Sequence, residues 1–176
     1  MRVYVESVLA CPPEKVWEEV QRPALHREIV RPLFRFVPAD PPQFPERWPE
    51  GATMHFKGYL FGIIPIGRHT IFLERIDPAA REIQSRESEP LVRRWDHLVR
   101  VRPSGDRQTL YSDEILIDAG WLTPFVWLFA QWFYRHRQRR WRRVARRLVT
   151  AEPAGSADGR PLRPQQELKS SEGGRC

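Results

Sequence analysis

The segment RRWDHLVRV, residues 93–101, contains a histidine in a position that invites a chemical explanation. Side chains of a β-strand point alternately to its two faces, so Trp95, His97 and Val99 share one face and mainly charged residues occupy the other. An imidazole in an apolar row has three uses. Such a histidine acts as a general base, holds the polar end of a ligand, or belongs to the core and forms a hydrogen bond with a neighbouring side chain.

Asp113 is predicted to face His97 across a hairpin. The turn PSGD between the two strands is short, and if Arg102 faces Gln108 across it, His97 faces Asp113. Directly opposed side chains come within ~4.5–5.5 Å of each other at Cβ, which is close enough for an imidazole–carboxylate hydrogen bond. The sequence places no nucleophile or oxyanion stabiliser beside this pair. The sequence therefore does not decide whether His97 is a core histidine with a hydrogen-bond partner, an anchor for a ligand or an acid–base catalyst.

The elements that position this pair follow from hydrophobic periodicity and turn residues. Alternation predicts a strand at 2–9, and the prolines and acids of CPPEKVWEEVQRP predict a helix, followed by a second short helix at 24–30. The proline-rich residues 38–51 predict an irregular loop, and a long helix is predicted at 122–149. Further strands are predicted at residues 33–37, 52–60, 67–76, 81–88, 93–102 and 107–118.

This order of elements predicts an α+β fold, in which consecutive antiparallel strands form one sheet. The long C-terminal helix is the only element large enough to cover the apolar face of that sheet. A curved sheet around one helix does not close tightly along its whole length. We therefore expect an elongated cavity between them, which is suited to a small apolar molecule.

Four stretches resemble the START/SRPBCC superfamily, over about residues 2–149. They are CPPEKVW after the first strand, GRHTIFLERIDPAARE as a hairpin, EPLVRRWDHLVRV, and TLYSDEILI followed by FYRHRQRRW on the last helix. The branch of ligand-binding SRPBCC-domain proteins is the most similar, although Leu91 stands where an aromatic residue is usual there. The resemblance implies the helix-grip fold, a curved antiparallel sheet around a long C-terminal helix. It implies no single function, because the superfamily contains lipid carriers, hormone receptors and polyketide cyclases.

The net charge of +7 comes from one segment, since residues 135–147 hold eight arginines and no acid. Cations near a helix C-terminus are favoured by the helix dipole, which makes a solvated basic end the simplest interpretation. Attraction to anionic lipids is the second interpretation. Binding to nucleic acid is not expected, because no stacking motif accompanies the cluster. The arginines predicted to meet an anionic surface are Arg139, Arg142, Arg143 and Arg146.

The hairpin tip YLFGIIPIG, residues 59–67, is apolar, which is unusual for a turn that faces solvent. Phe61, Ile63 and Ile64 are predicted to form a lid over the cavity mouth or a wedge into a bilayer surface. Residues 121–133 are also apolar nearly all round, but this run is shorter than the ~20 residues of a membrane span.

The cysteines, the first residues and the C-terminal segment bear on cofactors, location and domain boundaries. The two cysteines lie far apart and build neither a disulfide framework nor a metal site, and we predict no metal and no cofactor. The first residues alternate like a strand and do not resemble a signal peptide, so a cytoplasmic location is expected. Residues 151–176 lack aromatics and are rich in Pro, Gly, Ser and charge. They predict a disordered tail after one domain at 1–150.

We therefore predict a non-catalytic carrier or sensor of a small hydrophobic molecule, such as a lipid, a quinone or a polyketide-like ring. His97, Asp113 and Tyr111 would hold its polar end. Glu87 would reach the cavity or lie at its rim, and Tyr59 would reach the cavity or serve in packing. A polyketide cyclase or dehydratase, with His97 as base and Asp113 orienting it, is the first alternative. A protein associated with anionic membranes is the second. The residues predicted to line the apolar part of the cavity are Trp17, Trp95, Val99, Phe129 and Phe133.

Overall fold

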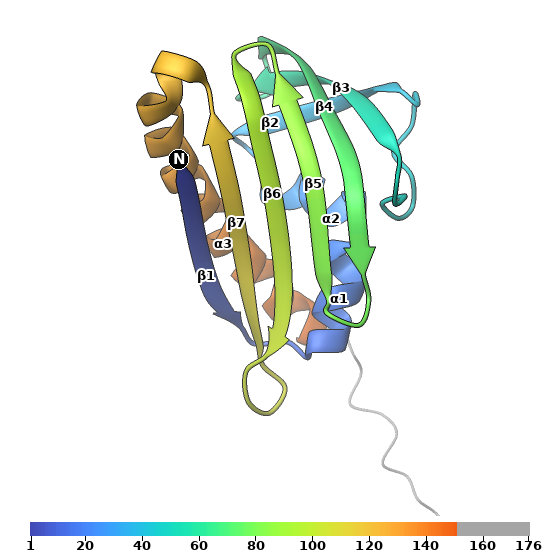
Figure 1. Cartoon of the computed structure of the whole chain (residues 1–176). Coiled ribbons are helices and arrows are strands. Elements are labelled where there is room, and N and C mark those ends of the chain that lie inside the picture. The colour runs from blue at the N-terminus through green and yellow to red at the C-terminus, as the bar shows by residue number, and fades with distance from the viewer. Residues whose placement is uncertain (151–176) are drawn as a thin grey trace, which may run out of the picture.

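The computed structural model describes residues 1–150, which form one sheet with helices on one of its faces (Figure 1). The predicted tail, residues 151–176, lies outside the described residues. The strands are β1 (Arg2–Leu9), β2 (Phe34–Asp40), β3 (Thr53–Leu60), β4 (Ile64–Asp77), β5 (Glu82–Glu89), β6 (Val92–Pro103) and β7 (Thr109–Asp118). The helices are α1 (Pro13–Val20), α2 (Pro23–Ile29) and α3 (Thr123–Thr150), with a 3-10 turn at Gly120–Leu122.

The strands follow the order β1-β7-β6-β5-β4-β3-β2, and every neighbouring pair is antiparallel. Helix α3 crosses the inner face of the curved sheet and packs mainly against β1 and β7, while α1 and α2 cover the same face farther along (Figure 1). This arrangement confirms the predicted α+β helix-grip fold.

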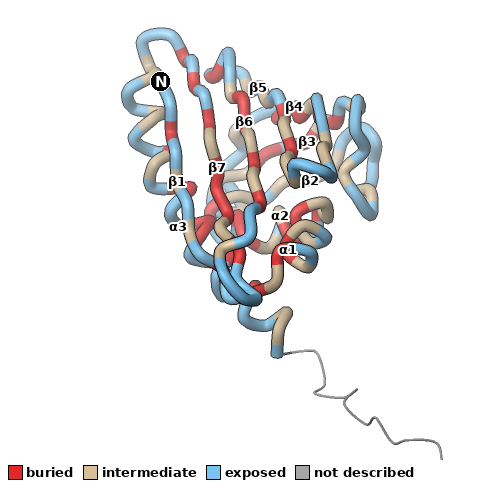
Figure 2. The backbone as a smooth tube through the Cα atoms, turned by 60° about the horizontal axis from the view of Figure 1, so that its bottom comes forward, coloured by how far each residue is buried: buried red, intermediate tan, exposed pale blue. Residues whose placement is uncertain are grey.

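The core lies between the inner face of the sheet and the helices. Figure 2 shows buried residues along β6 and β7 and in α1 and α2, whereas the connections between strands are exposed. Trp141 of α3 is fully buried and packs edge-on against Tyr111 of β7, with 6.0 Å between the ring centroids. This contact fixes the second half of α3 on the sheet.

Two element boundaries differ from the predicted ones by three residues, and the others differ by less. β2 continues to Asp40, inside the stretch predicted as loop, with Pro38 paired to Phe56. Proline has no N–H to donate to a neighbouring strand. It is tolerated in β2 because β2 is the edge strand of the sheet and has a neighbour on one side only. β4 begins at Ile64, three residues before the predicted start, which shortens the apolar tip of the β3–β4 hairpin.

The predicted register between β6 and β7 is wrong by two residues. Val99, not His97, is directly opposite Asp113. The cause is a turn of the predicted length that lies one residue farther along the chain, since Pro103 pairs with Thr109 and the Ser104 N–H donates a hydrogen bond to the Gln108 carbonyl oxygen. Since side chains alternate with a period of two, the shift leaves every side chain on its predicted face.

Candidate ligand-binding site

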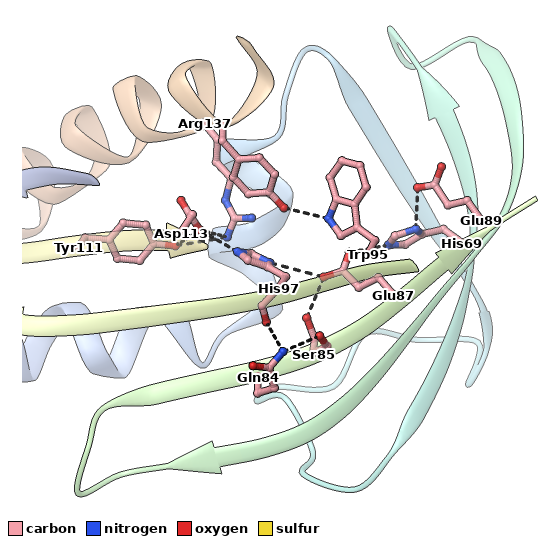
Figure 3. Close-up of polar contacts among 11 residues, drawn as sticks. His69, Gln84, Ser85, Glu87, Glu89, Trp95, His97, Tyr111, Asp113 and Arg137 are labelled. Atoms are coloured by element: carbon pink, nitrogen blue, oxygen red, sulfur yellow. Dashed lines mark hydrogen bonds and ion pairs between the residues drawn. The ribbon is translucent and has the colours of Figure 1, made fainter. Parts of the chain in front are cut away.

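Five ionisable side chains form a row across the inner face of the sheet, here called the charged row (Figure 3). His69 comes from β4, Glu87 from β5, His97 from β6, Asp113 from β7 and Arg137 from α3. Four adjacent strands and the helix that covers them thus each supply one member. Basic and acidic groups alternate along the row, and every side chain in it is buried or nearly so.

The charged row is held together by short contacts. His69 Nε2 lies 3.4 Å from Glu87 Oε2, and His97 Nδ1 lies 3.5 Å from Glu87 Oε1. The other ring nitrogen, His97 Nε2, forms a hydrogen bond of 2.8 Å with Asp113 Oδ1. Arg137 Nη2 is 3.7 Å from the same oxygen. His97 is therefore held between two carboxylates, and Asp113 between a histidine and an arginine.

The row runs diagonally over the strands. His97 is directly opposite Ser85 on β5 and Ile115 on β7, whereas its partners Glu87 and Asp113 are each displaced by two residues, in opposite directions. Diagonal neighbours on one face remain within reach of long side chains. The predicted hydrogen bond between His97 and Asp113 is therefore confirmed, although it joins diagonal neighbours and not directly opposite residues.

Asp113 is fully buried and both of its oxygens are satisfied. Oδ1 accepts the hydrogen bond of His97 and one of 3.1 Å from the Tyr111 hydroxyl. Oδ2 accepts a hydrogen bond of 3.0 Å from Gln138 Nε2, which also donates to the Val5 carbonyl oxygen at 2.7 Å. Gln138 thereby connects the charged row to β1.

The two carboxyl groups of the row are ionised at neutral pH. Burial by itself raises the pKa of a carboxyl group, because the charged form loses its hydration. At Asp113 the charge of Arg137 and the hydrogen bond of His97 outweigh burial and lower the pKa. At Glu87 burial is outweighed by the contacts with His69 and His97, which hold the pKa well below its usual value.

The same contacts favour the protonated histidines. Burial lowers the pKa of an imidazole, but hydrogen bonds with Asp113 and Glu87 outweigh it and raise the pKa of His97. Burial of His69 is outweighed by Glu87 and by Glu89, whose Oε1 lies 2.9 Å from Nδ1, and these carboxylates raise the pKa of His69 to about 9. His69 is therefore charged at neutral pH, and the charged form of His97 is stabilised.

Two cavities meet at the charged row. The outer cavity has a volume of about 390 Å³ and is lined by residues from the start of α3 and from the β3–β4 and β5–β6 hairpins. The inner cavity is much smaller, at about 50 Å³. His26, Glu87 and Arg137 line both cavities. The apolar and aromatic side chains in the wall of the outer cavity are Phe34, Phe36, Leu60, Ile66, Leu91, Val92, Trp95, Phe125, Val126, Phe129 and Phe133.

The domain of unknown function DUF8410 matches residues 7–145, a range that contains the whole charged row and all residues that line the two cavities. The chain belongs to the DUF8410 family. A search of curated proteins finds no match to its sequence.

Solved structures similar to this DUF8410 protein include two enzymes and a START superfamily protein. The Zhui aromatase/cyclase from Streptomyces sp. R1128 gives a TM-score of 0.61 at 15% identity, over 86% of this chain and 96% of that chain. Norcoclaurine synthase from Thalictrum flavum gives 0.61 at 12% identity, over 86% and 87%. The START superfamily protein from Mycobacterium smegmatis gives 0.59 at 13% identity, over 84% and 98%. These likenesses establish the fold of the START/SRPBCC superfamily.

Within residues 1–150 of the DUF8410 protein, no helix has both the length and the apolar character needed to cross a bilayer. In the same range, no group of three or more His, Cys, Asp or Glu side chains is arranged to hold a metal ion.

Most of the predicted ligand-contacting residues surround the two cavities. The outer cavity is lined by Trp95, Phe129 and Phe133. The inner cavity is lined by His97, Val99 and Tyr111. Asp113 is buried behind these three and reaches the cavities only through its partners.

Trp17 and Tyr59 line neither cavity. Trp17 lies on α1 and packs, partly buried, against the core. Tyr59 lies near the end of β3, where the Arg35 guanidinium is 5.7 Å from its ring centroid. For both residues the structure therefore favours a packing role, whereas Glu87, whose position the sequence left open, lines both cavities.

The tip of the β3–β4 hairpin stands beside the opening of the outer cavity. Phe61, Ile63 and Ile64 are exposed and line neither cavity, while Leu60 and Ile66, which flank them, line the outer one. In this structure the tip is therefore not a closed lid.

The four arginines predicted to meet an anionic surface are exposed at the other end of α3. Arg139 follows Phe125 by 14 residues, which corresponds to roughly 20 Å along a helix with a rise of ~1.5 Å per residue. The apolar tip and the arginines thus lie at opposite ends of the molecule. The arginines in question are Arg139, Arg142, Arg143 and Arg146.

Sequence reasoning predicted the aromatic contribution of α3 to the site, Phe129 and Phe133, but missed the polar one. Tyr134, Arg137 and Gln138 are buried and lie three to seven residues before the buried Trp141, so all four share one face of the helix. That spacing was a usable signal. It was hidden because Arg137 stands among eight arginines, most of which are exposed.

Proposed function

We propose that this protein binds a small hydrophobic molecule in the outer cavity and does not transform it. The observation that carries the proposal is an apolar cavity of about 390 Å³ that ends at the charged row. Small-molecule sites in proteins span roughly 300–1,000 Å³ and combine apolar walls with a few convergent polar groups. The aromatic walls would remove the apolar body from water, and the charged row would contact one end of it.

The environment of His97 supports binding over catalysis. A general base needs an unprotonated nitrogen within reach of the substrate. Both ring nitrogens of His97 face carboxylates, Nε2 toward Asp113 and Nδ1 toward Glu87, and these contacts stabilise the protonated ring. The alternative of a cyclase or dehydratase with His97 as base therefore lacks a free base at this position.

A charge placed in the outer cavity is expected to abolish binding of an apolar probe. Val126 lines the cavity from α3, whereas Leu128, two residues farther on, is exposed and does not. In Val126→Asp, the affinity for the uncharged fluorescent probe N-phenyl-1-naphthylamine should fall by about tenfold or more, which is ~1.4 kcal/mol. The measurement is a fluorescence titration.

Leu128→Asp is the matched control, and its affinity should stay within about twofold of the wild type. Circular dichroism would show that both variants are folded. Equal probe binding by the wild type and Val126→Asp would place the probe outside the cavity and contradict the proposal.

The exposed apolar residues around the opening favour a second candidate function, contact with a membrane surface from which the ligand enters. Trp121 is 82% exposed, Ile63 78% and Phe125 68%. Leu91, on the β5–β6 connection, is also exposed and lines the outer cavity with Phe125. Clusters of exposed apolar side chains commonly mark sites of interaction.

If this end of the molecule contacts a bilayer, Ile63→Asp should reduce co-sedimentation with phosphatidylcholine–phosphatidylserine vesicles several-fold. Val8→Asp is the control, because Val8 is an exposed apolar residue at the far end of β1. The substitution Arg142→Gln should have little effect, since Arg142 lies at the other end of α3. Failure of the wild type to sediment with vesicles at low salt would exclude this function.

A further inference from the structure

Three buried polar atoms of residues that line the cavities have no hydrogen-bond partner among residues 1–150. One of them, His69 Nδ1, lies 2.9 Å from the Glu89 carboxylate, whereas Arg137 Nε and His26 Nε2 have no such ion pair. Arg137 and His26 both line the outer and the inner cavity, so these two side chains lie where the cavities meet. A buried donor without an acceptor costs free energy, which a bound molecule with an accepting oxygen would recover.

The rest of the Arg137 side chain is fixed by its contacts. Its Nη2 donates to the Tyr111 hydroxyl at 3.3 Å and lies 3.7 Å from Asp113, and its guanidinium carbon is 5.4 Å from the centroid of the Tyr134 ring. The residue as a whole is 6% exposed. One edge of the guanidinium is therefore committed to the protein, and the Nε edge is held in place without a partner.

The carboxylates of the charged row pair mainly with its histidines. His69 is paired with Glu87 and with the partly exposed Glu89, and His97 is paired with Glu87 and Asp113. At the other end of the row, Arg137 shares Asp113 with His97 through its Nη2. Among the described residues, no acidic side chain pairs with the Nε edge of Arg137. This edge is therefore where an added negative charge would find a cation without a second partner.

From this geometry we infer that the ligand is a hydrophobic monocarboxylate, whose carboxylate is bound by Arg137 Nε–H and His26 Nε2–H while its apolar body fills the outer cavity. Hydrogen bonds from an arginine to a carboxylate are among the strongest in proteins. This inference rests on the proposed function and names the class of molecule that the cavity selects.

His26 suits the second contact because it adds a donor without adding a charge. Burial and the nearby charge of Arg137 lower the pKa of His26 to about 3, so its ring is neutral at physiological pH. A neutral imidazole carries one N–H, which donates to the ligand when it resides on Nε2. The ring is held in place beside Phe36 and Trp48, with centroid distances of 5.7 and 5.9 Å.

The test compares a fluorescent fatty acid, 11-(dansylamino)undecanoic acid, with its methyl ester. The two probes share one apolar body, but the ester has no negative charge. The wild type should bind the acid at least about tenfold more tightly than the ester. Arg137→Gln should bring the ratio of the two affinities close to one.

His26→Phe provides a second variant that leaves the charged row intact, and it should lower the preference for the acid several-fold. Arg135→Gln is the control, because Arg135 is exposed on α3 and its guanidinium bonds to Gln131. This control should keep the full preference.

The outcomes separate this inference from the proposed function. Equal binding of acid and ester by the wild type overturns the inference and leaves the proposed function standing. An unchanged ratio in both Arg137→Gln and His26→Phe also overturns it, because the carboxylate is then held elsewhere. If neither probe binds to the wild type, both the inference and the proposed function fail.

Discussion

Replacing Asp113 with leucine is expected to lower the free energy of unfolding by about 3–5 kcal/mol, although the two side chains are similar in size. Asp113 is fully buried and accepts hydrogen bonds from His97, Tyr111 and Gln138. Its removal leaves the positive charges of His97 and Arg137 in the interior without their shared carboxylate. Urea titrations followed by circular dichroism would give the difference in free energy.

The neighbouring Glu114 is the matched control, because its side chain points to the outer face of the same strand. Glu114 pairs there with Arg2 and Arg100, each at 2.7 Å. Surface ion pairs contribute ~0–1 kcal/mol, so Glu114→Gln should have a small effect. A loss of similar size in both variants would mean that the charged row is not the reason for the stability of the core.

A double mutant separates the charge effect from the effect of packing. In the Asp113→Leu background, His97→Phe removes one of the two basic side chains that have lost the Asp113 carboxylate. The second substitution should therefore cost less in this background than in the wild type, with a coupling energy on the order of 1–3 kcal/mol. Strictly additive effects of the two substitutions would show that the pair contributes nothing as a pair.

The sequence allowed the fold and the central pair of the site to be predicted for one physical reason, the two-residue period of a strand. The predicted register of β6 and β7 is wrong, yet His97 and Asp113 still meet, because a shift of two residues changes no side chain's face. A shift of one residue would have separated them. Face assignments are thus more robust than register assignments.

The sequence named Glu87 as a residue at the cavity or its rim, but the contacts of Glu87, His69 and Arg137 in the charged row were beyond this reasoning. His69 and Glu87 meet across strands whose pairing is interrupted by bulges, between Leu73 and Arg75 and between Glu87 and Glu89. A bulge moves one strand relative to the next in a way that alternation alone does not reveal. Arg137 could not be predicted for another reason. An arginine is expected to be exposed unless it pairs with a buried carboxylate, and the sequence does not show that Asp113 lies within reach of α3.

The charged row also predicts how stability depends on pH. The folded-state pKa of His69 is about 9, against a usual value of 6.5, so the folded protein keeps a proton that the unfolded chain has lost between these values. The stabilisation by His69 is therefore complete below pH 6.5 and is lost as the pH rises to 9. With ~1.36 kcal/mol per pKa unit, the loss is roughly 3 kcal/mol. His97, whose pKa is also raised, adds to it in the same direction.

The opposite holds on the acid side, because the pKa of His26 is lowered to about 3 and those of Asp113 and Glu87 are lowered as well. Unfolding then takes up protons, so stability falls as the pH drops below 6.5. Stability should thus reach its maximum near pH 6.5.

Urea titrations at intervals from pH 5 to 9 would test this curve, and His69→Gln should flatten its alkaline limb. His136→Gln, on α3 outside the charged row, should leave that limb in place. A wild-type stability that is constant from pH 6.5 to 9 would mean that His69 is not held as a cation between Glu87 and Glu89.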